Sequence, residues 1–111
     1  MSKHYNTIIS RYAEDDLIEI IEYYNIKNVI YSQKLLLALE KKVEELKEYP
    51  ERGRVVPELE KQNILEYREL IEGNYRIVYA IDGKNVIIHT IIDSRRNIDE
   101  LLIKKLLRMY A

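Results

Sequence analysis

The chain has 111 residues, which is the size of one domain, and we expect residues 1–111 to form a single domain. Hydrophobic residues make up 47% and charged residues 33%, while three glycines and two prolines exclude collagen-like and low-complexity chains. The absence of cysteine excludes disulfide scaffolds, thiolate metal sites and cysteine nucleophiles. Because the chain has only two histidines, the sequence predicts neither a metal site nor a cofactor.

Charge is distributed unevenly, although the net charge is only −1. Residues 1–51 contain seven basic and ten acidic residues (net −3), and residues 52–111 contain eleven and nine (net +2). Seven of the eight arginines lie in the second part. Guanidinium groups bind planar anions with two parallel hydrogen bonds, so these arginines are candidates for a binding site. Ordinary placement of arginine on strand surfaces explains the asymmetry equally well.

The first residues lack the apolar core of a signal peptide, and no stretch approaches the roughly eighteen apolar residues of a membrane-spanning helix. We therefore expect a soluble cytoplasmic protein that has no contact with a membrane.

The first half of the chain predicts a strand followed by two helices. Residues 4–9 resemble a short strand, and Ser10 is suited to cap a helix over about residues 12–26. A second helix is expected over 29–48, because Pro50 ends it. A short joint makes the two helices an antiparallel hairpin. The apolar stripe of the second helix consists of Ile30, Leu35, Leu36, Leu39, Val43 and Leu46.

The second half predicts three strands and a last helix. The strands cover residues 64–71, 75–81 and 86–92, and the turns fall at Gly73-Asn74 and Asp82-Gly83. A final helix is expected over 98–109. The order β-α-α-β-β-β-α predicts an α+β fold in two layers, with the helical hairpin packed on a mainly antiparallel four-stranded sheet.

Four short motifs follow one another on this pattern. Residues 50–58 read Pro-Glu-Arg-Gly-Arg-Val-Val-Pro-Glu, 67–70 read Tyr-Arg-Glu-Leu, 75–79 read Tyr-Arg-Ile-Val-Tyr, and Arg95-Arg96 follows the last strand. Each motif alone is weak, but all four in this order resemble the RelE/ParE toxin family of bacterial type II toxin–antitoxin modules. The resemblance covers nearly the whole chain.

The resemblance implies a growth-inhibiting toxin and leaves its mechanism open between two branches. RelE-like members cut messenger RNA on the ribosome, and ParE-like members act on DNA gyrase. If the chain is a ribonuclease, the matching positions imply catalytic roles for Arg76, Arg95 and Arg68. The wider set of candidate contacts with a macromolecular target is Arg52, Arg54, Arg68, Arg76, His89, Asp93, Arg95 and Arg96.

Departures from the nuclease pattern favour the ParE-like branch. Glu69 follows Arg68 where RelE-type nucleases have lysines, and Asp93 stands where many relatives have histidine. Neighbouring arginines favour the ionised form of Asp93, which makes it a poor proton acceptor near neutral pH. The sequence pI of about 6.1 is also low for a protein that docks into ribosomal RNA. An inactive homologue that only binds an antitoxin is a further alternative.

The resemblance also implies a partner, a cognate antitoxin that forms a hetero-oligomer with the toxin. The apolar stripe of the second helix is the candidate surface for it, although this stripe is more typical of a core. His89 and the tyrosines are likewise more typical of packing than of chemistry. We expect Arg54, Arg68, Arg76, Arg95 and Arg96 to converge on one side of the sheet.

Overall fold

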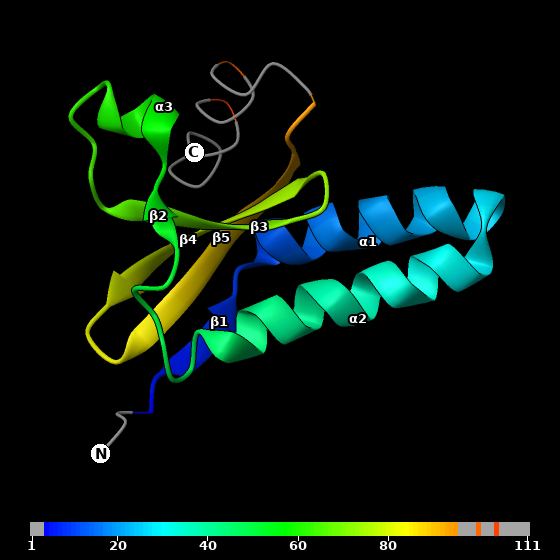
Figure 1. Ribbon diagram of the computed structural model, residues 1–111, viewed down its shortest axis with the longest axis horizontal. Coiled ribbons are helices and arrows are strands. Elements are labelled where there is room, and N and C mark those ends of the chain that lie inside the picture. The colour runs from blue at the N-terminus through cyan, green and yellow to red at the C-terminus, as the bar shows by residue number, and fades with distance from the viewer. Residues whose placement is uncertain (1–3, 96–99, 101–103, 105–111) are drawn as a thin grey trace.

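The structure, a computed structural model, describes residues 4–95, 100 and 104. Two long helices lie side by side and cover one face of a twisted sheet, and they extend beyond its edge (Figure 1). The strand order is β1-β5-β4-β3-β2. The elements are β1 (Asn6–Ile9), α1 (Arg11–Lys27), α2 (Val29–Glu45), β2 (Arg54–Val55), α3 (Pro57–Glu60), β3 (Tyr67–Glu72), β4 (Tyr75–Asp82) and β5 (Asn85–Asp93).

Polar side chains define the ends of the helical hairpin. Ser10 caps α1, because its hydroxyl accepts a hydrogen bond from the Ala13 N–H at 3.1 Å, as predicted. Asn28 ends α1 with its backbone and caps α2 with its side chain, so one residue serves as the whole joint. A short joint forces the helices to run antiparallel, which confirms the predicted hairpin.

The second helix ends at Glu45, three residues before the predicted end. The chain tightens there, since the Leu46 and Lys47 N–H groups bond to carbonyls three residues earlier. This turn buries Leu46 completely and brings the Lys47 carbonyl to the Tyr5 N–H at 2.8 Å. The helix therefore ends at this tightened turn, which lies before Pro50 and contacts the chain that leads into β1.

Within the described part of the chain, the sheet contains five strands instead of the predicted four. The meander β3-β4-β5 is antiparallel as expected, and Gly73 and Gly83 both adopt positive φ in its two turns. β1 adds to β5 in parallel, with Asn6 opposite Asn85. The additional strand is β2, whose two residues pair with β3. A two-residue strand has too few positions to show an alternating pattern, so the sequence did not reveal it.

The start of β3 also differs from the prediction. It begins at Tyr67 rather than at residue 64, because a short helix, α3, and a closing turn occupy the preceding residues. Asn63 adopts a φ of 61°, and the Ile64 N–H bonds back to the Leu59 carbonyl at 2.9 Å. The predicted helix over 98–109 lies outside the described residues, apart from Glu100 and Lys104, which are helical.

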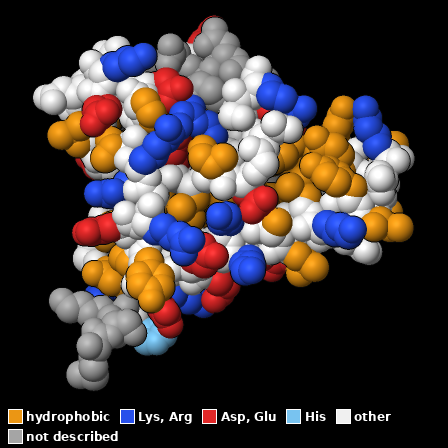
Figure 2. Space-filling view, in the orientation of Figure 1, with side chains coloured by type: hydrophobic (Ala, Val, Ile, Leu, Met, Phe, Trp, Pro, Cys, Tyr) orange, Lys and Arg blue, Asp and Glu red, His pale blue; other side chains and the backbone are white. Residues whose placement is uncertain are grey.

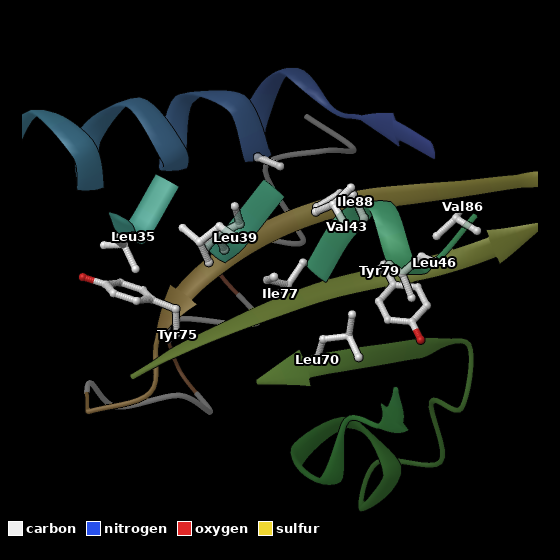
Figure 3. Close-up of a cluster of buried hydrophobic side chains, with 12 residues drawn as sticks. Leu35, Leu39, Val43, Leu46, Leu70, Tyr75, Ile77, Tyr79, Val86 and Ile88 are labelled. Carbon is white, nitrogen blue, oxygen red and sulfur yellow. The ribbon is translucent and has the colours of Figure 1, made fainter. Parts of the chain in front are cut away.

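Apolar side chains occupy both faces of the sheet. On the hairpin face, Leu39 of α2 and Ile77 and Ile88 of the sheet are almost completely buried within one cluster (Figure 3). On the opposite face, α3 and the loop before it cover a smaller cluster that contains Val56, Leu59, Tyr67, Val78 and Ile92. The meander is therefore covered on both sides, and the second side carries the charged groups described next.

Candidate functional site

Arg76 lies at the centre of a buried ionic cluster on the face that carries α3. Its Nη1 and Nη2 donate to the two carboxylate oxygens of Glu58 at 2.9 and 3.0 Å. Nη2 also donates to Glu69 Oε2 at 2.9 Å, and Nε lies 2.9 Å from Glu69 Oε1. Arg76 is only 5% exposed and Glu69 only 1%. The guanidinium is thus held between two carboxylates with little access to solvent.

The pKa values follow from this geometry. Partial burial raises the pKa of Glu58, but the hydrogen bonds and charge of Arg76 outweigh it, so the pKa lies below its usual value. Burial lowers the pKa of Arg76, yet its contacts with Glu58 and Glu69 bring the net pKa above the usual value. Both groups are therefore charged throughout the neutral range.

Arg54 completes the cluster from β2. Its Nε donates to Glu69 Oε2 at 2.7 Å, while more than half of its side chain remains exposed. The pairing of Arg54 with Glu69 across β2 and β3 places the two side chains on the same face. Two guanidinium groups and two carboxylates make the cluster electrically neutral.

The side chain of Arg68 leaves the strand on the opposite face of the sheet, next to that of its cross-strand partner Tyr79. Its Nη1 donates to the Gly53 carbonyl at 2.8 Å. The Tyr79 hydroxyl donates to the Pro50 carbonyl at 2.7 Å and accepts from the Gly53 N–H at 2.9 Å. Tyr79 is completely buried, and burial raises its pKa. Arg68 and Tyr79 therefore hold the loop between α2 and β2 in place.

The remaining arginines of the predicted set lie elsewhere. Arg52 pairs with Glu45 at 3.4 Å. Arg95 pairs with Asp93 through Nε at 3.0 Å and Nη2 at 2.6 Å, and its backbone N–H also donates to that carboxylate. The contact with Asp93 raises the pKa of Arg95. Arg96 lies outside the described residues.

The prediction that the arginines converge on one side of the sheet is wrong for the residues that the structure describes. Arg54 and Arg76 share the α3 face, Arg68 starts from the hairpin face, and Arg95 lies beyond the end of β5 near Tyr24. Strand register separates Arg68 from Arg76: Arg68 pairs with Tyr79, and Tyr79 lies three residues from Arg76 along β4, so their side chains point to opposite faces.

His89 occupies a β-bulge, because Val78 pairs with Thr90 and Tyr79 with Ile88. Its ring contacts Tyr67 edge to face, with 5.3 Å between centroids. Burial lowers the pKa of His89, so it is neutral at physiological pH. Thr90, next to it, donates to Asp16 of α1 at 2.6 Å, and the Ile91 N–H donates to the same oxygen. The bulge thus provides the polar connection between α1 and the sheet.

The apolar stripe of α2 is mostly used within the chain. Leu35, Leu39, Val43 and Leu46 are buried against the sheet and α1 (Figure 3). Leu36 is half-buried, and Ile30 is exposed. Of the six residues, only these two leave apolar surface for a partner, and the other four belong to the core.

Sequence reasoning missed three residues that shape the site. Glu58 and Glu69 belong to the motifs but carry no predicted role in the site, and Tyr79 is among the tyrosines predicted to pack. The signal for Glu69 is its place two residues from both Tyr67 and Ile71, since residues at this spacing share one face of a strand and an apolar face predicts burial. Among the described residues, no group of three or more acidic residues or histidines is arranged to hold a metal ion, and no described helix is long and apolar enough to span a membrane.

A helical hairpin covering one face of a mostly antiparallel meander is the architecture of RelE/ParE-like toxins, and solved structures share it. The chain is similar to a structure described as a chromosomal ParDE TA system from P. aeruginosa, with a TM-score of 0.68, 19% identity, and coverage of 81% of this chain and 96% of that one. It is also similar to the toxin–antitoxin complex RelBE2 from Mycobacterium tuberculosis, with a TM-score of 0.54, 18% identity, and coverage of 82% and 92%.

A comparison of the sequence with models of protein families identifies the family. The model of the ParE toxin of type II toxin–antitoxin system, parDE, matches residues 7–98. The chain belongs to this ParE toxin family, as its motifs had indicated. No curated protein matches the chain significantly.

Proposed function

We propose that this toxin inhibits growth by binding DNA gyrase and that it does not cut RNA. The observation that carries the proposal is the state of Arg76, the residue at the position of the catalytic arginine in RelE-like nucleases. It is buried, and its N–H groups face the carboxylates of Glu58 and Glu69. An arginine held in this way contributes to the fold, and its side chain is only 7% exposed.

RNA cleavage by attack of a 2′-hydroxyl requires cations that face the developing phosphorane charge. A phosphate could reach Arg76 only by displacing Glu58, which would leave that carboxylate without its partner beside a second negative group. Losing one partner of a buried ion pair costs about 3–5 kcal/mol. Arg68 contacts backbone carbonyls and Arg95 contacts Asp93, so neither compensates for this cost.

The proposed partner that restrains the toxin is a cognate antitoxin, bound in a hetero-oligomer in the cytoplasm. Apolar side chains gather over the far end of the helical hairpin (Figure 2). Ile26 is 89% exposed, and Ile30 is 65% exposed. A segment that folds on binding would cover these residues and gain their burial. The exposed large apolar side chains of α1 and α2 are Ile18, Tyr23, Ile26, Val29, Ile30, Tyr31 and Leu37.

Two assays with the purified chain test the proposal. Inhibition of gyrase supercoiling is expected, together with the absence of cuts in ribosome-bound message by primer extension. Cuts in the ribosomal A site that disappear in Arg76→Ala would overturn it. Arg11→Ala is the matched control, because Arg11 is exposed and lies in α1 away from the cluster. Expression without growth arrest would instead support an inactive homologue.

A further inference from the structure

A separate pocket of about 310 Å³ lies where α1 crosses the ends of β4 and β5. Tyr23 and Tyr24 of α1 and Tyr75 of β4 supply aromatic walls, and Ile20 and Ile91 supply the apolar part. The rings of Tyr23 and Tyr24 meet edge to face with 5.0 Å between centroids. The Tyr75 hydroxyl donates to Tyr24 at 3.3 Å, so the two rings are fixed relative to each other. The volume suits a single long side chain.

The charged groups in the pocket are predominantly negative. Asp16, Glu19 and Asp93 line it together with Arg95, which gives a formal net charge of −2. Arg95 is bound to Asp93 through two side-chain contacts and one backbone contact, so this pair is internally neutralised. Asp16 is buried and accepts from β5. Glu19 is exposed at the rim, and it is the carboxylate most accessible to a ligand.

The tyrosine rings favour the same kind of ligand as the carboxylates. An aromatic face attracts a cation placed within about 6 Å of its centroid. Tyr23 already attracts one, because the Lys27 ammonium lies 4.5 Å from its ring centroid. A cationic group in the pocket would therefore lie among tyrosine rings and beside a rim carboxylate, with no unpaired positive charge among the lining residues that the structure describes.

We propose that this pocket receives an arginine or lysine side chain from the cognate antitoxin. The pocket adjoins the exposed apolar surface of the hairpin, because Tyr23 belongs to both. A segment that covers that surface would thus reach the pocket with a neighbouring residue. The identity of the partner rests on the proposed function, whereas recognition of a cation depends only on the pocket.

The first experiment tests the pocket without any partner. N-acetyl-L-arginine amide is titrated into the full ¹⁵N-labelled chain at low salt, and its neutral isostere N-acetyl-L-citrulline amide is titrated separately. Amide shifts around Glu19 and Ile91 are expected with the arginine probe only. Glu19→Gln should weaken its binding by roughly threefold to tenfold, as expected when one charge contact is lost. Glu22→Gln, the same change on an exposed residue of α1 outside the pocket, should leave it unaltered.

Arg95→Gln should change the affinity for the arginine probe in the direction opposite to Glu19→Gln. It removes one positive charge and makes the pocket more negative, so the arginine probe should bind more tightly by a similar factor. A purely structural role for these residues would not produce tighter binding. Equal shifts with both probes, or equal weakening in Glu19→Gln and Glu22→Gln, would overturn the proposal.

The second experiment measures the affinity of the full chain for the antitoxin encoded beside it. Glu19→Gln and Tyr23→Leu should each weaken the complex by about threefold to tenfold, while Glu22→Gln does not. Unchanged affinity in both variants overturns the pocket proposal, even when growth arrest and its relief by the antitoxin are intact. Pocket variants that alter gyrase inhibition but not antitoxin affinity would assign the pocket to the target and also overturn it. Loss of growth arrest in the wild-type chain would instead contradict the proposed function.

Discussion

Replacing Glu69 with glutamine removes the central negative charge of the ionic cluster and changes its size very little. The carboxylate is completely buried and lies within 2.9 Å of Arg76 and 2.7 Å of Arg54. Without its charge, the cluster changes from neutral to +1, and Arg76 retains only Glu58 as a partner. Loss of one member of a buried pair costs about 3–5 kcal/mol, and the remaining contact with Glu58 favours the low end, near 3 kcal/mol.

Urea denaturation measures this loss directly. With a slope of about 1.5 kcal/mol per molar for a domain of this size, 3 kcal/mol lowers the unfolding midpoint by roughly 2 M. Glu66→Gln is the matched control, because Glu66 is exposed just before the same strand, and its midpoint should shift by less than about 0.3 M. If the two variants unfolded at the same urea concentration, the cluster would contribute nothing to stability. Arg76 would then not be a residue that the fold requires.

Three further changes test other parts of the structure. Gly53→Ala would place a Cβ 2.5 Å from both the Glu69 carbonyl and the Tyr79 hydroxyl, so we expect a loss of about 2 kcal/mol or more by urea denaturation. Ser10→Ala removes the cap of α1 and should cost about 1 kcal/mol by the same measurement; no loss would show that the cap is dispensable. The lowered pKa of His89 means that the unfolded chain binds a proton first as pH falls below 6.5, so stability decreases with falling pH in that range. His89→Gln should flatten this dependence, and an unchanged slope between pH 6.5 and 5 would refute the assignment.

The architecture followed from the sequence because its signals are local and repeated. Ser10, Asn28 and the glycine turns define where elements start and stop, and helical or alternating periodicity defines the elements themselves. Features that depend on a single residue, or on residues distant in the sequence, could not be predicted in this way. The two-residue strand β2 and the bulge at His89 lack any periodic pattern.

The site was harder to predict for a related reason. The arginine-containing motifs and their order along the chain indicated the family. The partners of each arginine, however, depend on the register of the strands and on the face to which each side chain points. Register placed Glu69 between Arg54 and Arg76 and placed Arg68 on the other face. The motifs that contain Arg54 and Arg76 therefore also lie close in sequence to Glu58 and Glu69, the carboxylates that neutralise these arginines. Only the three-dimensional pairing distinguishes a phosphate site from an internal ion pair.

The parallel pairing of β1 with β5 has a consequence for synthesis of the protein. The first strand finds its partner 79 residues later, since Asn6 lies opposite Asn85. Until β5 has left the ribosome, β1 has no neighbour and the Asp16 carboxylate lacks its donors Thr90 and Ile91. At roughly 5–20 residues per second, β1 waits about 4 to 16 seconds for the strand that pairs with it. The sheet and the contacts of Asp16 with β5 are thus completed only late in the synthesis of the chain.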